Sequence, residues 1–287
     1  MATTLAVDVG GTKLAAAVVA DDGTIIRRAQ VPTAGDAEGM FRSLVDTADE
    51  VRTGDEAVCG VGCGGPMAPS GETVSPLNIP AWRAFPLRSR LREHLGLDVF
   101  VDNDAKALAL GEGWCGAAAG ERDFLAMVVS TGVGGGIVLD GRLLDGALGN
   151  AGHIGHVIVR PGGATCACGA RGCLEAEASG TGIRARTGRA PEEATPELVE
   201  DVGTMVGRAV ASVCNLLDLR LVVVAGSVAL GFGAPFFAAA QAELDACARL
   251  DFSVGARIVP AGLGADGPLV GAAAVAWRPL GVAGIPA

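Results

Sequence analysis

Residues 4–31 read TLAVDVGGTKLAAAVVADDGTIIRRAQV. Two apolar runs flank the glycine pair Gly10–Gly11, and a turn at Asp22–Gly23 leads into a third run. Apolar runs joined by short glycine turns are typical of β-hairpins, so the stretch predicts three successive strands. A strand that enters a helix through its glycines, as in a Rossmann dinucleotide turn, is excluded, and the spacing of a Walker loop is absent.

The same pattern returns in residues 124–146, FLAMVVSTGVGGGIVLDGRLLDG, which again read as strand, glycine turn and strand. Two such units indicate two related α/β lobes that share a ligand cleft, although glycine-rich hairpins also arise independently. A chain of 287 residues exceeds the usual size of one core. We therefore expect an N-terminal lobe over 1–115 and a C-terminal lobe over 116–287, with a last helix over 268–280 that packs back on the first lobe.

The remaining segments alternate between helical and strand patterns. Helices are predicted around 38–52, after Asn103 or Asp104 as cap, over 196–217, and from Ser227 through 236–250 as one element. Buried strands are predicted near 57–63, 98–102, 219–225 and 257–261. The proline-punctuated segment 75–82 predicts a loop whose Asn78 and Trp82 face a ligand, with a purely structural loop as the alternative.

Composition limits the partners and the compartment. The net charge of -10 disfavours nucleic acid and anionic membranes. No apolar run is long enough to span a membrane, and the N-terminus lacks the pattern of a signal peptide. Eight cysteines without an export signal predict reduced thiols in a cytoplasmic protein.

Residues 149–175, GNAGHIGHVIVRPGGATCACGARGCLE, hold two of the three histidines and three of the eight cysteines. One imidazole and three thiolates, from His156, Cys166, Cys168 and Cys173, form the four-ligand set that zinc prefers in structural sites. The alternatives are ordinary core cysteines or a disulfide pair. A zinc ion here would fix the neighbouring side chains of His153 and Glu175 without taking part in chemistry.

The two glycine turns predict a phosphate site, because exposed N–H groups in a tight turn attract anions. The first turn is Gly10, Gly11, Thr12 and Lys13, and the second contains Thr131, Gly132 and Gly134–Gly136. Asp8, at the end of the first strand, could face a Mg2+ ion. Together these features favour a nucleotide polyphosphate such as ATP.

Asp104 follows a predicted strand and begins a predicted helix, which places its carboxylate at the cleft. Phosphoryl transfer to a hydroxyl requires one carboxylate to orient that hydroxyl and accept its proton, and we assign this general-base role to Asp104. The alternative is that Asp104 only caps its helix. Asn103, Asn78, Glu175 and His153 form a set of hydrogen-bonding groups suited to a polyol.

These motifs resemble the ROK family of sugar kinases (repressors, open reading frames, kinases), within the actin-like and hexokinase-like ATPase superfamily. The resemblance is carried by DVGGTK at 8–13, NDA at 103–105, STGVGGG at 130–136 and the GH-x9-C-x-C-G-x2-GCLE block at 155–175. These motifs span nearly the whole chain, and the chain looks most like actinobacterial glucokinases. The resemblance implies a two-lobed fold with ribonuclease H-like lobes and a homodimer.

The resemblance also implies individual roles. It makes Asp104 the catalytic base and Gly65, Asn78, Asn103, His153, His156 and Glu175 contacts of the sugar, with His156 shared between zinc and sugar. It assigns ATP and Mg2+ to Asp8, the first glycine turn, Thr131 and Gly132, and the adenosine to Gly226 and Ser227.

Two positions depart from the family pattern. His153 stands where the family has the glutamate of Glu-x-Gly-His, so we expect a changed preference among hexoses, amino sugars and cyclitols, or else a packing histidine that points away. Lys106 stands where asparagine is frequent, and we expect a solvated side chain, with an approach to a phosphate as the alternative.

Three functions fit these observations. The leading one is an ATP-dependent kinase of a primary hydroxyl on a glucose-like hexose or related polyol, with polyphosphate as a less favoured donor. A sugar-sensing repressor is disfavoured by the acidic charge and by a phosphate strand that begins near Met1. A sugar-binding protein without kinase activity is the third.

Overall fold

The computed structural model describes residues 2–287, which form two compact units. The first contains the chain up to Gly120 together with Gly141–Ala151 and Gly262–Ala287, and the second contains Glu121–Asp140 and Gly152–Ala261. The lobe boundaries at 115 and 116 stay a prediction. Among the described residues, no helix is both long and apolar enough to cross a membrane.

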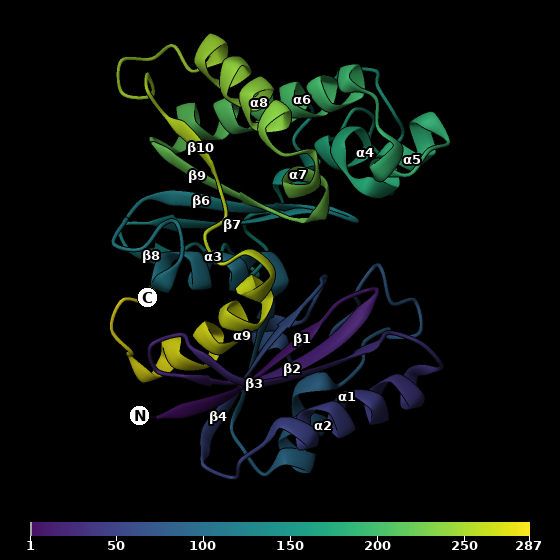
Figure 1. Ribbon diagram of the computed structural model, residues 1–287, viewed down its shortest axis with the longest axis vertical. Helices are drawn as coiled ribbons and strands as arrows, with labels where there is room; N and C mark the ends of the chain where they lie inside the picture. The colour runs from purple at the N-terminus through teal and green to yellow at the C-terminus, as the bar shows by residue number, and fades with distance from the viewer. Residues whose placement is uncertain (1) are drawn as a thin grey trace. The chain divides into compact units, whose positions relative to one another are not determined.

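The sheet of the first unit has the order β3-β2-β1-β4-β5 (Figure 1). Its strands are β1 (Thr3–Val9), β2 (Lys13–Ala20), β3 (Ile25–Pro32), β4 (Glu56–Cys63) and β5 (Val99–Asn103). β1, β2 and β3 are antiparallel neighbours, as the glycine turns predict, whereas β1, β4 and β5 run parallel. Val9, Cys63 and Asn103 are in register, so the carboxyl ends of three strands meet at one edge.

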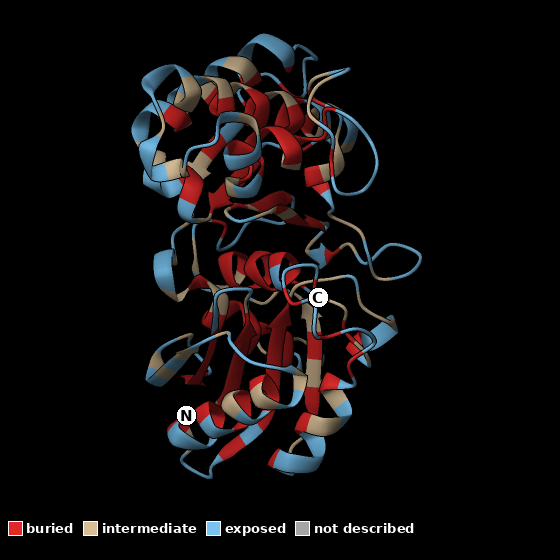
Figure 2. Cartoon of the chain, turned by 90° about the vertical axis from the view of Figure 1, so that its right-hand side faces the viewer, coloured by how far each residue is buried: buried red, intermediate tan, exposed pale blue. Residues whose placement is uncertain are grey.

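Helices cover both faces of this sheet because strand side chains alternate between faces. The helices are α1 (Ala37–Val51), α2 (Leu87–Leu95), α3 (Asp104–Cys115) and α9 (Gly267–Trp277), with short 3-10 turns η1 (Pro69–Gly71), η4 (Gly264–Asp266) and η5 (Arg278–Leu280). Leu5 and Val7 of β1 face a core shared with α1 and α2, whereas Ala6 faces α9. The buried residues line these contacts (Figure 2).

The second unit repeats this topology. The second sheet has the order β10-β9-β6-β7-β8. Its strands within this unit are β6 (Phe124–Val129), β7 (Val133–Leu139), β9 (Leu221–Ala225) and β10 (Arg257–Pro260), whereas the two-residue edge strand β8 (Arg142–Leu143) belongs to the Gly141–Ala151 segment that is grouped with the first unit. β6 and β7 are antiparallel, and β6, β9 and β10 are parallel, as in the equivalent positions of the first sheet. The predicted repeat of strand, glycine turn and strand is confirmed.

The helices of the second unit are α4 (Leu174–Ala178), α5 (Gly180–Thr187), α6 (Pro196–Leu217), α7 (Ser227–Phe232) and α8 (Ala234–Cys247), with 3-10 turns η2 (Ile154–His156) and η3 (Pro191–Glu193). α6 packs closely on α8. The helices approach so closely at Gly207 that a methyl group there would lie 2.3 Å from the carbonyl oxygen of Ala240. The prediction of one helix after Ser227 was wrong. Gly233, at φ 63° and ψ -147°, separates α7 from α8.

Candidate functional site

The carboxyl edge of the first sheet brings two aspartates together. Asp8 lies in β1 and is buried, whereas Asp104 begins α3 directly after β5 and is exposed. Gly62 of β4 lies between them. A methyl group at this position would be 3.9 Å from Oδ1 of Asp8 and 3.8 Å from Cα of Asp104. The absence of a side chain at this position leaves the two carboxylates as neighbours.

Burial and the charge of Asp104 raise the pKa of Asp8 to about 7, against a smaller lowering effect of Lys13. A carboxyl group in such surroundings binds its proton more tightly than in water, because the charged form loses hydration. A cation beside Asp8 would reverse this effect. The environment of Asp8 therefore suits a metal-facing carboxylate, as the sequence predicts for Mg2+.

The start of α3 fixes the direction of Asp104. Asn103 is the N-cap, and its side-chain oxygen accepts a hydrogen bond from the backbone N–H of Ala105 at 3.0 Å. Oδ1 of Asp104 accepts from the same N–H at 2.9 Å. Of the two predicted caps, Asn103 therefore holds the cap position, while the carboxylate of Asp104 lies at the positive end of the helix dipole.

The other predicted residues of the first unit lie around this edge. Gly10 donates its N–H to the carbonyl oxygen of Lys13 at 3.0 Å, which closes the first glycine turn. A methyl group at Gly11 would lie 2.6 Å from Cβ of Asn78, and one at Gly65 would lie 3.5 Å from Nδ2 of Asn103. The backbone of the turn thus contacts the loop that carries Asn78.

Trp82 does not face a ligand, contrary to expectation. Its side chain is fully buried and stacks on Phe85 with ring centroids 4.3 Å apart. Its indole N–H donates to the carbonyl oxygen of Ala37 at 3.1 Å. The indole belongs to the core that joins the 75–82 loop to α1.

Lys106 is buried, which contradicts the expectation of a solvated side chain. Its ammonium group contacts Oδ1 of Asp145 at 2.6 Å and Oδ1 of Asp102 at 3.0 Å, with 3% of the side chain exposed. Arg278 contacts both carboxylates at longer range, 3.4 Å and 3.9 Å. These ion pairs connect the 141–151 segment to α3.

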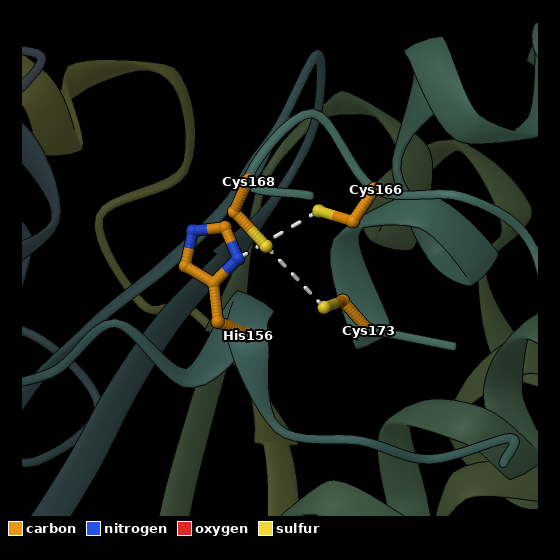
Figure 3. A group of neighbouring side chains, drawn as sticks. All are labelled: His156, Cys166, Cys168 and Cys173. Carbon is orange, nitrogen blue, oxygen red and sulfur yellow. Dashed lines mark hydrogen bonds between the residues drawn. The ribbon is translucent and has the colours of Figure 1, made fainter. Parts of the chain in front are cut away.

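The second unit assembles the predicted metal ligands (Figure 3). The ligand atoms of His156, Cys166, Cys168 and Cys173 all lie within 4.8 Å of one another. Cys166 Sγ is 3.7 Å from Nδ1 of His156, and Cys168 Sγ is 3.7 Å from Cys173 Sγ. A tetrahedron with Zn–S distances of about 2.3 Å has edges of about 3.8 Å. The donor set and the spacing therefore fit zinc, and Nδ1 is the imidazole atom on the side of the metal group.

Burial raises the pKa values of Cys173 and Cys166, while backbone hydrogen bonding to Ala170 lowers that of Cys168. Zinc binds thiolates, so loading the site must displace protons from the two buried thiols. We expect the zinc affinity of the metal-free protein to fall as the pH is lowered.

Glu175 and the two histidines lie next to this group. Glu175 Oε2 accepts a hydrogen bond from the N–H of Val133 at 3.0 Å, so this predicted sugar ligand contacts the second glycine turn. The rings of His153 and His156 are 6.0 Å apart between centroids and inclined by 25°. His153 thus lies beside the imidazole of the candidate metal group, and its contact with the sugar stays a prediction.

The predicted adenosine residues lie at the same edge of the second sheet as the second glycine turn. Ser227 Oγ is 2.9 Å from Ser130 Oγ, which precedes Thr131. Gly226 has φ 103°, and a methyl group there would lie 2.3 Å from the carbonyl oxygen of Val129. Only glycine allows this approach of β9 to β6.

Sequence reasoning missed residues that support these positions. Thr181 donates its hydroxyl to the carbonyl oxygen of Thr131 at 2.8 Å, and Gly180 donates its N–H to that of Ser130 at 2.7 Å. Glu177 contacts the loop of the metal ligands. No local sequence pattern marks these contacts, because the partners are far apart along the chain. Glu177 and Ala164 are separated by 13 residues, and Thr181 and Thr131 by 50.

Comparison with solved structures defines the class. The structure matches a ROK family glucokinase from Streptomyces griseus, solved with glucose and AMPPNP, with a TM-score of 0.84 and 29% identity over 96% of this chain and 99% of the other. The protein therefore has the predicted actin-like and hexokinase-like ATPase fold.

The sequence specifies the family. Residues 4–278 match the ROK family, and the chain belongs to it. An N-acetylmannosamine kinase of Citrobacter koseri is 38% identical over 248 residues, which cover 80% of this chain and 85% of that protein. A glucokinase of Thermotoga maritima is 41% identical over 186 residues, but the match spans only 63% of this chain and 58% of that protein.

Proposed function

We propose that this ATP-dependent carbohydrate kinase transfers the γ-phosphoryl group of ATP to the primary hydroxyl of a hexose, with Asp104 as general base. The observation that carries the proposal is the exposed carboxylate of Asp104 beside Asp8 and the first glycine turn. Asp104 accepts the hydroxyl proton while the hydroxyl oxygen attacks the γ-phosphorus and ADP leaves.

The remaining roles are proposed from the family resemblance and from the surroundings of each residue within its own unit. Asp8, the N–H groups of Gly11 and Thr12 and the ammonium group of Lys13 suit Mg2+ and phosphate, while the N–H of Gly10 closes the turn. Thr131, Gly132, Gly226 and Ser227 suit the nucleotide. Gly65, Asn78, Asn103, His153, His156 and Glu175 supply hydrogen bonds for the sugar. His156, Cys166, Cys168 and Cys173 would hold a structural zinc ion, which fixes the position of the loop. We also propose a homodimer of two-lobed subunits.

An N-acylated amino hexose of the N-acetylmannosamine type is the acceptor that we favour. Neutral imidazole at His153 offers one donor and one acceptor, which matches an acetamido group better than a carboxylate does. The N-acetylmannosamine kinase match also extends over more of both chains than the Thermotoga maritima glucokinase match does. Glucose is the second candidate, favoured by the structural match to the Streptomyces griseus enzyme.

ADP release with a panel of N-acetylmannosamine, glucose, mannose and cyclitols, and with ATP or polyphosphate as donor, tests this proposal. We expect the highest kcat/KM with ATP and an acetamido sugar. No turnover with any polyol would instead support a sugar-binding or regulatory protein.

His153→Glu should shift the acceptor preference toward glucose. A carboxylate cannot donate to an acetamido oxygen, so the ratio of kcat/KM for N-acetylmannosamine to that for glucose should fall at least about tenfold. His94→Gln, which changes the histidine of α2 in the other unit, should leave the ratio unchanged. An unchanged ratio in His153→Glu would place His153 outside the sugar site.

Binding of Mg2+ and nucleotide should weaken in acid through Asp8. Because its pKa is raised to about 7, Asp8 is largely neutral at pH 6 and largely ionised at pH 8. If only the ionised form faces Mg2+, the affinity for MgAMPPNP should fall about tenfold from pH 8 to pH 6. Calorimetric titration at both pH values tests this, and Asp8→Asn should bind weakly with no comparable pH dependence. A pH-independent affinity of the wild type would contradict the role of Asp8.

A further inference from the structure

We propose that Glu177 anchors the metal-bearing loop, residues 157–173, to helices α4–α6 without the help of the metal, and so positions Glu175 on the same helix. The part that concerns Glu175 rests on the proposed sugar site. Glu177 touches neither substrate nor metal in this proposal. It acts as a positioning residue through three partners, Ala164, Arg160 and Arg186.

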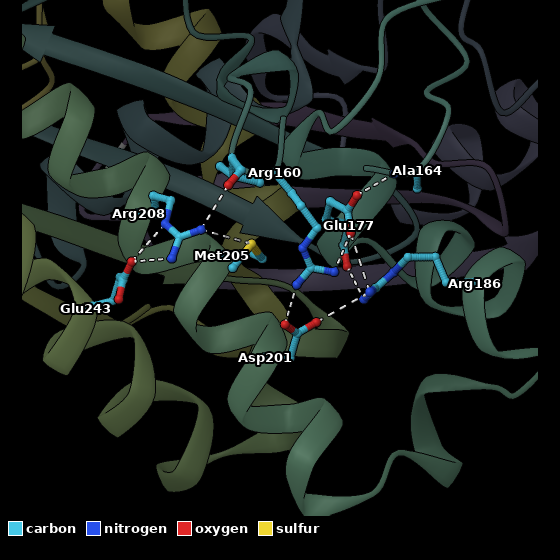
Figure 4. Close-up of polar contacts among 9 residues, drawn as sticks. Arg160, Ala164, Glu177, Arg186, Asp201, Met205, Arg208 and Glu243 are labelled. Carbon is cyan, nitrogen blue, oxygen red and sulfur yellow. Dashed lines mark hydrogen bonds and ion pairs between the residues drawn. The ribbon is translucent and has the colours of Figure 1, made fainter. Parts of the chain in front are cut away.

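The carboxylate of Glu177 is almost completely buried, with 1% of the side chain exposed. Its Oε1 accepts a hydrogen bond from the N–H of Ala164 at 2.6 Å, and its Oε2 accepts from Arg160 at 3.1 Å. Arg186 Nη1 lies 3.4 Å from the same Oε2 (Figure 4). A buried carboxylate is stable only when such partners replace its water, so the contacts to the loop are the reason that this charge can be buried.

Ala164 connects this carboxylate to both ends of the metal-binding turn. It lies two residues before Cys166, and its carbonyl oxygen accepts from the N–H of Gly172 at 2.8 Å, directly before Cys173. A methyl group at Gly163 would lie 2.2 Å from Oε1 of Glu177, so the backbone approaches too closely for any side chain there. Fixing Ala164 therefore fixes both segments that carry thiol ligands.

Glu175 and Glu177 point away from each other on α4. Two residues along an α-helix are separated by about 200° of rotation. Glu175 accordingly contacts Val133 of the second glycine turn, while Glu177 contacts the loop. The short helix is held on two sides, and loss of the Glu177 contacts frees the element that carries Glu175.

Loss of the charge of Glu177 would leave the positive charges around it without balance. Arg160 and Arg186 also contact Asp201 of α6, so two guanidinium groups share two carboxylates. Arg186 additionally donates to the carbonyl oxygen of Glu177 at 2.5 Å, while its Nε has no hydrogen-bond partner within residues 2–287. In Glu177→Gln two guanidinium groups face only one carboxylate, that of Asp201. Arg160 and Arg186 then repel each other, and this repulsion moves Arg160 and the loop away from α5.

Hydrogen exchange of the 157–173 segment tests the proposal, measured by mass spectrometry in the Zn2+-loaded protein and after treatment with a chelator. In the stripped wild type we expect residual protection around Ala164, and in stripped Glu177→Gln we expect that protection to fall at least about tenfold. The matched control is Glu112→Gln. Glu112 is a fully buried carboxylate of the first unit that accepts backbone N–H groups of Ala117, Gly262 and Leu263.

Release of Zn2+ to a chromophoric chelator gives a second readout. Residues behind a metal site typically change metal affinity or activity by about 10–100-fold, so Glu177→Gln should release zinc at least about tenfold faster and raise the KM for sugar more than it lowers kcat. Glu112→Gln should match the wild type in both. Equal protection in stripped wild type and Glu177→Gln, or equal acceleration in both variants, would overturn the proposal.

If Glu177→Gln does not fold, Arg160→Gln tests the same anchor with a smaller expected effect, because Ala164 then keeps a charged acceptor and Arg186 keeps both of its carboxylate partners. Its loop should exchange faster than that of the wild type, and an unchanged rate would again contradict the anchor. Failure of the wild type to phosphorylate any sugar would count against the proposed function alone, since protection of the stripped loop needs neither substrate nor metal.

Discussion

Asp104→Asn should abolish nearly all turnover while the protein stays folded. Asparagine keeps the size of the side chain and an oxygen that can accept from the N–H of Ala105, so the start of α3 should survive. What it removes is the basic oxygen that takes the proton of the sugar hydroxyl. A general base contributes about 10²–10⁴ in rate, and we expect a loss of this size in kcat.

The measurement is coupled ADP release at saturating sugar and ATP, together with binding of sugar by calorimetry. Because the loss concerns the transition state, the Kd for sugar should change far less than kcat. Asp36→Asn serves as the matched control, since it makes the same change at the N-cap of α1, outside the proposed site, and should leave kcat unchanged. Undiminished kcat in Asp104→Asn would remove Asp104 from the mechanism and reduce it to a residue at the helix terminus.

Local patterns sufficed for the paired hairpins of both sheets. Continuous apolar runs and glycines at fixed places between them are properties of neighbouring residues, so the elements around Gly10 and Gly132 could be predicted. The metal group could be predicted for the same reason, because all four ligands lie within 18 residues of one another. A metal site whose ligands all lie in one short segment can be recognised from the spacing of its ligands in that segment.

Burial of a side chain by residues that are distant along the chain could not be predicted from local patterns. Lys106 is buried because Asp102 and Asp145 compensate its charge, and Asp145 is 39 residues away. Trp82 looked like a ligand-facing residue in an irregular loop, but the loop itself packs on α1 through the indole. The charged helix α2 went unrecognised, since only Leu87, Leu91 and Leu95 mark its buried side.

The shortening of the last long helix has a different cause. The apolar pattern from Ser227 to Cys247 is continuous enough to suggest one helix, but Gly233 separates the two that form and Pro235 stands in the first turn of α8. Isolated glycine is tolerated within many helices, so sequence does not tell whether it will adopt a left-handed conformation. Pro235 is the local signal that this prediction overlooked, because proline fits the first turn of a helix and not its interior.

Cys173→Ser should cost the protein its zinc and the order of the proposed sugar loop. Cys173 is both a member of the metal group and the N-cap residue of α4, so one substitution affects the ion and the helix that carries Glu175. A structural Zn2+ contributes about 10–16 kcal/mol to folding of small metal domains, and a neutral hydroxyl is a poor replacement for a thiolate ligand. We expect metal content well below one per chain after dialysis against a chelator, and a fall in sugar kcat/KM of at least about 100-fold.

Elemental analysis and MgAMPPNP binding separate this effect from general unfolding. Asp8 and the first glycine turn belong to the other unit, so a substantial part of nucleotide binding should persist in Cys173→Ser. Cys214→Ser is the matched control, because Cys214 is a fully buried cysteine of α6 in the same unit and lies outside the metal group. A Cys173→Ser protein that retains stoichiometric zinc and wild-type kcat/KM would remove Cys173 from the metal ligands and would show that the proposed sugar loop does not depend on this thiolate.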